Sequence, residues 1–219
     1  MNFTEYQLRR RIAAVARTLA EQGLARSSDG NISVRLDDQR LLITPSGAYK
    51  GAMRLNDILV IDLQGNPLSR TAKARPSSET WMHIEVYRHR PQVRAVLHAH
   101  PPYATALTLA GLSFPHELVP EALVALGVVP TVPYATPGTP QMAEHLQPFL
   151  KDYDVLLLDH HGSLTLGRTL EEALIKLERL ETVAQLYFLA RQLGEIVPLP
   201  AGEISRLNEI GIRYRKEWL

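Results

Sequence analysis

The chain has 219 residues, of which 45% are hydrophobic and 21% are charged, and this balance excludes a largely disordered protein. Its formal net charge is +1, so overall charge favours neither nucleic acid nor a membrane surface as a partner, and no apolar run is long enough for a membrane span. Cysteine is absent, which excludes disulfides and leaves any metal to histidines and carboxylates. We expect a single cytoplasmic domain over residues 1–219.

The first part of the chain is predicted to form one helix and three strands. The segment Thr4–Gln7 has the pattern of a capping box, and apolar residues then recur with helical spacing up to Gly23. Asn31–Leu36 and Arg40–Thr44 are typical of a hairpin, and a third strand is expected within Asp57–Leu68.

The middle of the chain is predicted to place one strand between two helices. The first helix starts at Ser77 or Ser78, which are good N-caps, and stops before Pro91. The strand covers Val93–His100, and the second helix covers Tyr103–Gly111.

The last part of the chain is predicted to add a strand and several helices. The strand, Val155–Leu158, runs into a glycine-containing loop, and the longest helix covers Thr169–Gly194. The other predicted elements are a short helix over Pro120–Gly127, an extended segment over 128–135, a helix over Thr139–Leu150 and a helical tail from Ala201. Because strands and helices do not alternate regularly, we expect an α/β protein with a mixed or antiparallel sheet covered by helices.

Histidines occur where two of the predicted strands end. His98 and His100 are two residues apart, so on a strand they would project from the same face. His160 and His161 follow the strand Val155–Leu158, and one of this adjacent pair faces a given side. Histidine triads are common metal ligands, so the pattern favours a metal centre over a chance polar strand end. The remaining histidines are expected to be solvated or packed: His83, His89, His116 and His145.

Glu79 directly follows the two serines that would cap a helix. A capping box would place a glutamate three residues after the cap, so capping does not explain Glu79. It is either a carboxylate favoured by the helix dipole or a group beside a cation, acting as a ligand or as an acid and base.

Three short turns contain small residues with free backbone N–H groups. They are Ser28–Ser33, Thr44–Gly47 and Pro76–Ser78. Together they would cradle a phosphate, although each alone is also typical of an ordinary turn. No P-loop is present, so a nucleotide is not indicated.

These segments together resemble the class II aldolase/adducin family. The matching motifs are "DGNISVR", "LLITPSG", "PSSE", "VRAVLHAHPPYATAL", "VPYATPGT" and "LLLDHHGSLTLGRTLEEA", in the family's order. The resemblance implies a three-layer α/β/α fold with a mostly antiparallel central sheet. It also implies a divalent metal, most often zinc with manganese, cobalt or iron possible, a phosphorylated small sugar as substrate, and a homotetramer.

By position in these motifs, His98, His100 and His161 match the family's metal ligands and Glu79 matches its catalytic acid and base. The residues that match its phosphate-binding and substrate-binding turns are Asn31, Thr44, Gly47, Ser77 and Ser78.

The implied reaction is cleavage of a ketose 1-phosphate, similar to fuculose phosphate, into dihydroxyacetone phosphate and a small aldehyde through a metal-stabilised enediolate. Glu79 would move the proton. None of the five lysines lies in the motifs, which favours metal chemistry over a Schiff base. The alternatives are an epimerase, dehydratase or decarboxylase that uses the same enediolate, and a non-catalytic adducin-like binding module.

Two positions depart from the fuculose-phosphate branch of the family. That branch has a tyrosine near the position of Pro120 and Glu121, and another near the C-terminus, where this chain has Ile210. Glu121 and Tyr214 are candidate substitutes for these tyrosines, and Tyr214 lies one helical turn after Ile210. The alternative is that both are ordinary surface residues of helices.

Overall fold

The computed structural model describes residues 3–68 and 74–217, and its centre is a seven-stranded sheet with the order β3-β2-β1-β4-β7-β6-β5. Neighbouring strands are antiparallel except β5 and β6, which are parallel, so the expected mostly antiparallel sheet is confirmed. The strands are β1 Asn31–Arg35, β2 Arg40–Ile43, β3 Leu59–Asp62, β4 Ala95–Ala99, β5 Thr131–Val132, β6 Val155–Leu158 and β7 Gly162–Gly167.

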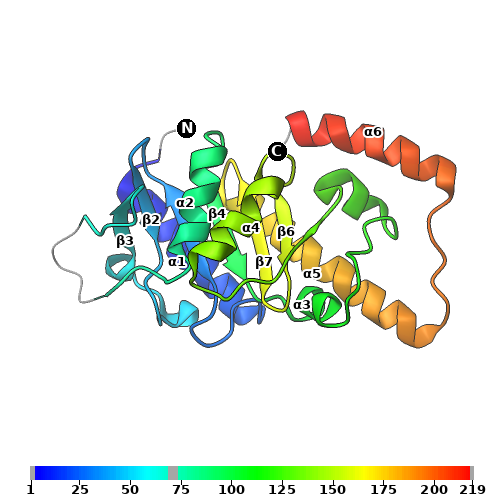
Figure 1. Cartoon of the computed structure of the whole chain (residues 1–219), viewed down its shortest axis with the longest axis horizontal. Helices are drawn as coiled ribbons and strands as arrows, with labels where there is room; N and C mark the ends of the chain where they lie inside the picture. Colours follow the sequence, from blue (N-terminus) through cyan, green and yellow to red (C-terminus); the bar gives the residue numbers. More distant parts are fainter. Residues whose placement is uncertain (1–2, 69–73, 218–219) are drawn as a thin grey trace.

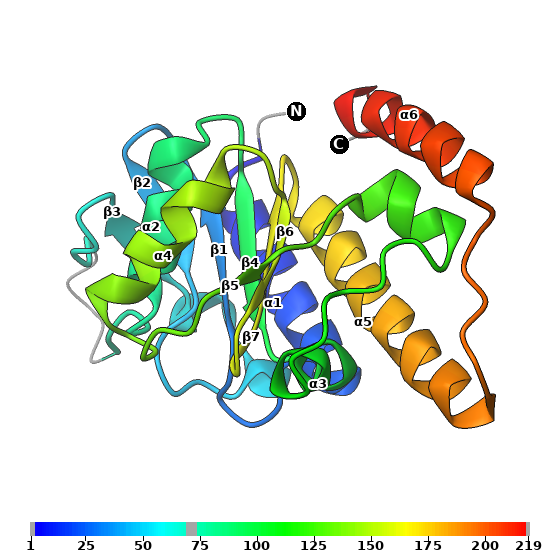
Figure 2. The ribbon, with the colours of Figure 1, turned by 45° about the vertical axis from the view of Figure 1, so that its right-hand side comes forward.

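Helices cover both faces of this sheet and complete the expected three layers (Figure 2). Side chains alternate between the faces, so Ile32 and Val34 of β1 join one core while Leu41 and Ile43 of β2 join the other. The first core includes α1 (Glu5–Glu21), α3 (Pro102–Leu109) and α5 (Leu170–Leu193), and the second includes α2 (Thr80–His89) and α4 (Pro140–Leu150). Within residues 3–68 and 74–217, no helix combines the length and hydropathy needed to cross a membrane.

The C-terminal helix α6 (Ala201–Glu217) forms as predicted and lies apart from the sheet at one end of the molecule (Figure 1). It packs on η3 (Ala122–Leu126), a short π-helical turn where the sequence predicts a helix over Pro120–Gly127. Arg215 of α6 fixes this contact by donating hydrogen bonds to the carbonyl oxygens of Leu123 and Val124 at 2.7 and 2.9 Å.

Several elements differ from the prediction. Strand β7 occupies the segment predicted as a glycine loop, and the extended segment over 128–135 contains the short strand β5. Helix α2 begins at Thr80, so Ser77 and Ser78 lie before the helix and Glu79 is the N-cap residue. Two single helical turns that the sequence does not predict follow β2: η1 (Lys50–Ala52) and η2 (Leu55–Asp57).

Candidate metal centre

Three histidines meet at the end of β4. His98 lies in β4, His100 follows it, and His161 lies in the tight turn between β6 and β7. The pairing of Ala99 with Ser163 places that turn against the end of β4. The three ring centroids are 4.7–4.9 Å apart in every pair, and the Nε2 atoms of His98 and His100 are 3.0 Å apart. The predicted convergence of two strand-end motifs is therefore present.

The turn also decides between the two adjacent histidines. His160 has a φ of 56°. Its Nδ1 lies 2.8 Å from Oδ1 of Asp159, and its ring is not part of the histidine cluster. Gly162 does not have a positive φ, so backbone conformation does not require glycine there. Its role is space: a Cβ there would collide with the Ala99 carbonyl and come within 2.9 Å of Cδ2 of His100. Glycine therefore lets β7 approach the histidines.

Hydrogen bonding fixes which nitrogen of His98 faces the cluster. Nδ1 donates to the carbonyl oxygen of Ser163 at 2.9 Å, so the lone pair of a neutral ring lies on Nε2. Burial lowers the pKa of His98 to about 3 and also lowers the pKa of His100, so these rings are neutral at pH 7. A neutral imidazole with its second nitrogen anchored is the form that binds a metal ion.

The donor set fits a divalent cation. Two nitrogens bound to one tetrahedral zinc at 2.0–2.1 Å would lie roughly 3.3 Å apart, close to the 3.0 Å between Nε2 of His98 and Nε2 of His100. In the described part of the chain, Nδ1 of His161 is buried without a hydrogen-bond partner. Buried polar atoms are normally satisfied, so this unpaired nitrogen fits a donor set that binds a cation.

The carboxylate of Glu79 closes the fourth side of the cluster. Its Oε1 is 3.0 Å from Nε2 of His161, and its Oε2 is 3.4 Å from Nε2 of His98. Asn31 donates from Nδ2 to Oε2 at 2.8 Å. Burial alone would raise the pKa of Glu79, but the hydrogen bonds from His161 and Asn31 and the nearby imidazoles lower it below its usual range. Glu79 is therefore an ionised group beside the cluster.

The predicted phosphate turns lie next to Glu79. Pro45 and Pro76 form an isolated bridge that brings two of the turns together, and Asn31 also donates to Oγ of Ser77 at 3.1 Å. Gly47 has a φ of +70° and nothing within 4 Å of a Cβ, so its backbone faces open space. The bridge thus places the turn Thr44–Gly47 beside the turn Pro76–Ser78, Asn31 contacts Ser77, and Ser78 packs closely against Gly138.

Thr44, the fifth predicted residue, is fully buried. Its Oγ1 accepts a hydrogen bond from the backbone N–H of Ile32 at 3.1 Å, and its own N–H donates to the Ile32 carbonyl. Its side chain therefore fixes β2 against β1 at the base of the turn.

The family model described as Class II Aldolase and Adducin N-terminal domain matches residues 10–188 of this chain. The chain belongs to this family. It is 35% identical over 210 residues to 3-oxo-tetronate 4-phosphate decarboxylase of Escherichia coli K12, covering 93% of this chain and 96% of the relative. It is 41% identical over 160 residues to L-fuculose phosphate aldolase of Methanococcus vannielii, covering 73% and 83%. The crystal structure of YgbL from Escherichia coli superposes with a TM-score of 0.85 at 34% identity, covering 93% of this chain and 99% of that one.

Membership fits the retained histidine cluster and Glu79, and the protein is an enzyme of the class II aldolase family. An adducin-like module without catalysis would have no physical use for a converging set of buried imidazoles and a buried carboxylate.

Lys50 is a residue that the sequence analysis missed. It is 1% exposed, and its Nζ donates to the carbonyl oxygens of Ser28 and Ala48 at 3.1 and 2.9 Å. It therefore joins the "SDGN" turn to the "TPSG" turn, and burial lowers its pKa to about 8. Its position three residues after Gly47 is the one signal in the sequence that places a lysine near this class II aldolase site.

Glu121 and Tyr214 are not grouped with the histidines in this copy of the chain. Glu121 immediately precedes η3, and Tyr214 lies in α6, which packs on η3. The side chain of Glu121 is exposed and that of Tyr214 is partly buried. Their roles as substitutes for the family tyrosines stay predictions.

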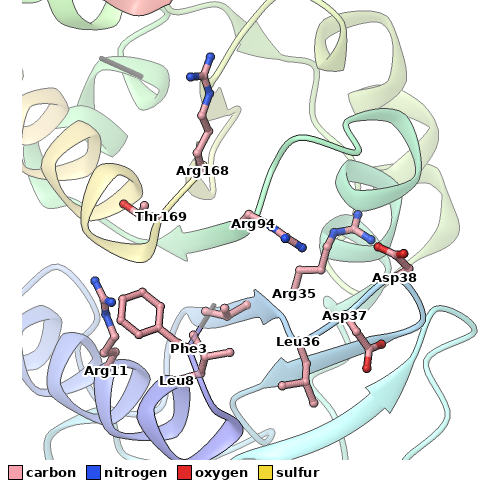
Figure 3. A pocket seen from close by; sticks show the side chains of 11 residues that line it. Phe3, Leu8, Arg11, Arg35, Leu36, Asp37, Asp38, Arg94, Arg168 and Thr169 are labelled. Atoms are coloured by element: carbon pink, nitrogen blue, oxygen red, sulfur yellow. The ribbon is translucent and has the colours of Figure 1, made fainter. Parts of the chain in front are cut away.

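A cavity of about 390 Å³ lies at the opposite end of β1 and β4, where Arg35 and Arg94 meet (Figure 3). Arg35 is already used there, since it donates to the carbonyl oxygens of Tyr87 and Val93. Arg11 stacks on the ring of Phe3, 4.0 Å from the ring centroid. Arg35 and Arg11 make structural contacts around this cavity, and the histidine cluster lies at the other end of β1 and β4.

Proposed function

We propose that this enzyme is a divalent-metal-dependent carbon–carbon lyase that splits a small ketose 1-phosphate into dihydroxyacetone phosphate and an aldehyde. The supporting observation is the convergence of three imidazoles and one ionised carboxylate beside two phosphate-type turns. Zinc suits a three-histidine set, and manganese, cobalt and iron also accept imidazole ligands.

The residues take distinct roles in this proposal. His98, His100 and His161 would hold the cation through one ring nitrogen each. The bound cation supplies Lewis-acid stabilisation of the negative charge that develops as the carbon–carbon bond breaks.

Glu79, which is ionised at rest, takes the proton of the hydroxyl on the leaving carbon and returns it to the carbon that loses its bond, because its carboxylate lies directly beside the cluster. The backbone N–H groups near Gly47 and the hydroxyls of Ser77 and Ser78 bind the phosphate, and Asn31 orients Glu79 and the substrate.

Decarboxylation of a phosphorylated keto sugar acid is the second candidate. Carbon dioxide leaves from a carboxylate without proton transfer, whereas an aldehyde leaves from a hydroxyl that must be deprotonated. The family tyrosines that handle the aldehyde are replaced here at Pro120–Glu121 and Ile210. The extensive similarity to the decarboxylase of Escherichia coli K12 also favours this candidate.

We also propose that the enzyme is a homotetramer. The second half of α5 exposes several large apolar side chains, and Leu193 is 90% exposed. Several large exposed apolar side chains on one helix are more typical of a subunit contact than of free surface. Light scattering that gives the mass of a single chain at micromolar concentration would contradict this assembly.

A substrate panel tests the proposed reaction. The metal-loaded enzyme is incubated with ketose 1-phosphates, ketose 5-phosphates and phosphorylated keto sugar acids, and dihydroxyacetone phosphate and carbon dioxide are measured separately. Release of dihydroxyacetone phosphate with an aldehyde supports the lyase, and release of carbon dioxide supports the second candidate. Products that keep every carbon of the substrate would overturn both in favour of an epimerase or a dehydratase.

Glu79→Gln tests the catalytic role in the same assay. Turnover should fall about a hundredfold or more while bound metal stays near one per chain, because the amide cannot exchange a proton but keeps the shape of the side chain. Glu144→Gln, an exposed change on α4, is the control and should match wild type. Full activity of Glu79→Gln would show that Glu79 has no catalytic role and is only a carboxylate favoured by the helix dipole.

A further inference from the structure

A buried row of polar side chains runs from Glu79 into the layer between α2 and β1. Glu79, His83 and Tyr87 are four residues apart, so they lie on one face of α2. Asn31 and Ser33 are two residues apart and share the face of β1 that meets α2. Apart from Glu79, each of these residues is 3% exposed or less.

Four contacts link the row end to end. The hydroxyl of Tyr87 is 2.9 Å from Oγ of Ser33, and that Oγ is 2.6 Å from Nδ1 of His83. Nε2 of His83 contacts Oδ1 of Asn31, and Nδ2 of Asn31 donates to Oε2 of Glu79.

The carboxylate at the end of the row determines the direction of every bond. An ionised carboxylate accepts only, so Asn31 turns its NH2 group to Glu79 and its carbonyl oxygen to His83. Nε2 of His83 must then carry the hydrogen, and a neutral ring leaves Nδ1 to accept from the Ser33 hydroxyl. The Tyr87 hydroxyl donates to the remaining lone pair of Ser33.

We infer that His83 is a positioning residue for the reaction, which locks the amide of Asn31 so that its NH2 group holds the Glu79 carboxylate. Ser33 and Tyr87 hold His83 in the tautomer that this requires. The inference rests on the proposed function because Glu79 is the group being positioned. Burial supports it independently by lowering the pKa of His83 to about 4, which keeps the ring neutral near pH 7.

Loss of His83 would release the amide of Asn31. Either end of the amide would then face Glu79, and the carbonyl end repels a carboxylate. Substitution of groups that orient catalytic ligands typically lowers activity tenfold to a hundredfold. We expect His83→Leu to lower turnover by about this factor.

A double-mutant cycle separates positioning from general stability. Turnover is measured for wild type, His83→Leu, Asn31→Ala and the double variant, with the metal bound. If His83 acts through Asn31, His83→Leu has no further effect in the Asn31→Ala background. His83→Gln should recover most of the turnover, because its amide N–H reaches the position of Nε2. His89→Leu, an exposed change on the same helix, is the matched control and should match wild type.

The tautomer of His83 is measured directly by two-bond ¹H–¹⁵N correlation spectra of the wild-type protein at pH 7. A neutral ring with its hydrogen on Nε2 supports the inference, and a hydrogen on Nδ1 or a doubly protonated ring overturns it. This measurement is made on the wild-type protein, so it requires neither an activity assay nor a folded variant. If the wild type is active and His83→Leu has the same turnover, the inference about His83 is wrong and the proposed function stands. If the wild type is inactive but His83 has the expected tautomer, the proposed function is wrong and the inference about the tautomer stands.

Discussion

Buried charged or polar side chains lie at both ends of the β6–β7 hairpin, and the two ends differ in how completely these side chains are hydrogen-bonded. At the end away from the histidines, Lys176 of α5 is 2% exposed. Its Nζ donates to Asp154 at 3.0 Å, to Glu172 at 2.6 Å and to the carbonyl oxygen of Leu166 at 2.9 Å, which uses all three of its hydrogens. Arg90 donates to the second oxygen of Asp154 at 2.7 Å.

At the other end, the nitrogens of the histidines face one another, and one of them has no partner in the described part of the chain. The Nε2 atoms of His98 and His100 are 3.0 Å apart, and Nδ1 of His161 has no partner in the described part of the chain. A closed polar cluster, whose hydrogen bonds are all satisfied, rigidifies a fold, whereas an open cluster, which has an unsatisfied group, can bind a further ligand. The two ends therefore differ: the cluster around Lys176 holds the fold together, and the cluster around His98 is the candidate metal site.

The largest effect is expected at the open end. His98→Ala removes a fully buried imidazole from the three-histidine set, so the purified protein should contain no bound metal and show no metal-dependent activity. His116→Ala, which lies outside the cluster, should retain both. Elemental analysis after dialysis measures the metal content, and one metal per chain in His98→Ala would contradict the assignment.

The closed end should respond in stability and leave metal binding unchanged. Lys176→Met leaves the Glu172 carboxylate buried without its cation and removes one of the two cations beside Asp154, which should lower the free energy of unfolding by about 3–5 kcal/mol. Urea unfolding measures the change, and Lys151→Met, which alters an exposed lysine, is the control. A loss of metal affinity in folded Lys176→Met would show that the two ends are not separate.

Gly162→Ala tests the close approach of β7 to the histidines. The added Cβ would collide with the Ala99 carbonyl and press on His100, so overpacking should cost about 1–3 kcal/mol in stability and weaken metal binding. Gly202→Ala, where a Cβ meets nothing within 4 Å, should cost neither. Calorimetric metal titration of both variants decides, and equal affinities would show that the turn has room to adapt.

The two ends should also differ in pH dependence, by a smaller amount. Burial lowers the pKa of His83 to about 4 and that of His98 to about 3, from an ordinary 6.5. The unfolded chain therefore binds more protons than the folded chain below about pH 6.5. As the pH is lowered from this value, the free energy of unfolding decreases by up to about 1.4 kcal/mol per pH unit for each ring. Burial raises the pKa of Asp154, but Lys176 and Arg90 outweigh this and lower it, so its stabilising effect is lost only below about pH 4.

Urea unfolding of the metal-free protein at pH 7, 6 and 5 measures this dependence. His83→Gln should flatten the slope because it removes one titrating ring. An unchanged slope in this variant would show that His83 does not stay neutral in the folded protein.

The sequence predicted most of the fold because the helices and strands have clear periodicity and caps. The Thr4–Gln7 capping box forms in full. Thr169 caps α5 through the N–H of Glu172, but the carboxylate of Glu172 bonds to Lys176 and to the N–H of Arg168 instead of completing a box. Strand β7 was missed because glycine at both of its ends is typical of a loop, whereas here glycine provides close approach.

The sequence also predicted the histidines of the site, because their spacing and strand-end positions are local features. The strand pattern alone left His160 and His161 open, and the family resemblance indicated His161. In the structure, the folded turn places the His161 ring against His98 and His100. The roles of Lys50 and His83 depend on contacts between segments far apart in the chain, such as the Ser28 and Ala48 carbonyls and the side chains of β1. Local patterns do not contain this information.

Crystallography with anomalous scattering at the absorption edge of a bound zinc ion tests the central claim most directly. We expect one peak within about 2.0–2.1 Å of one nitrogen each of His98, His100 and His161, with Glu79 beside it. Protein with zinc at full occupancy elsewhere, or with the three rings turned away from a common point, would contradict it.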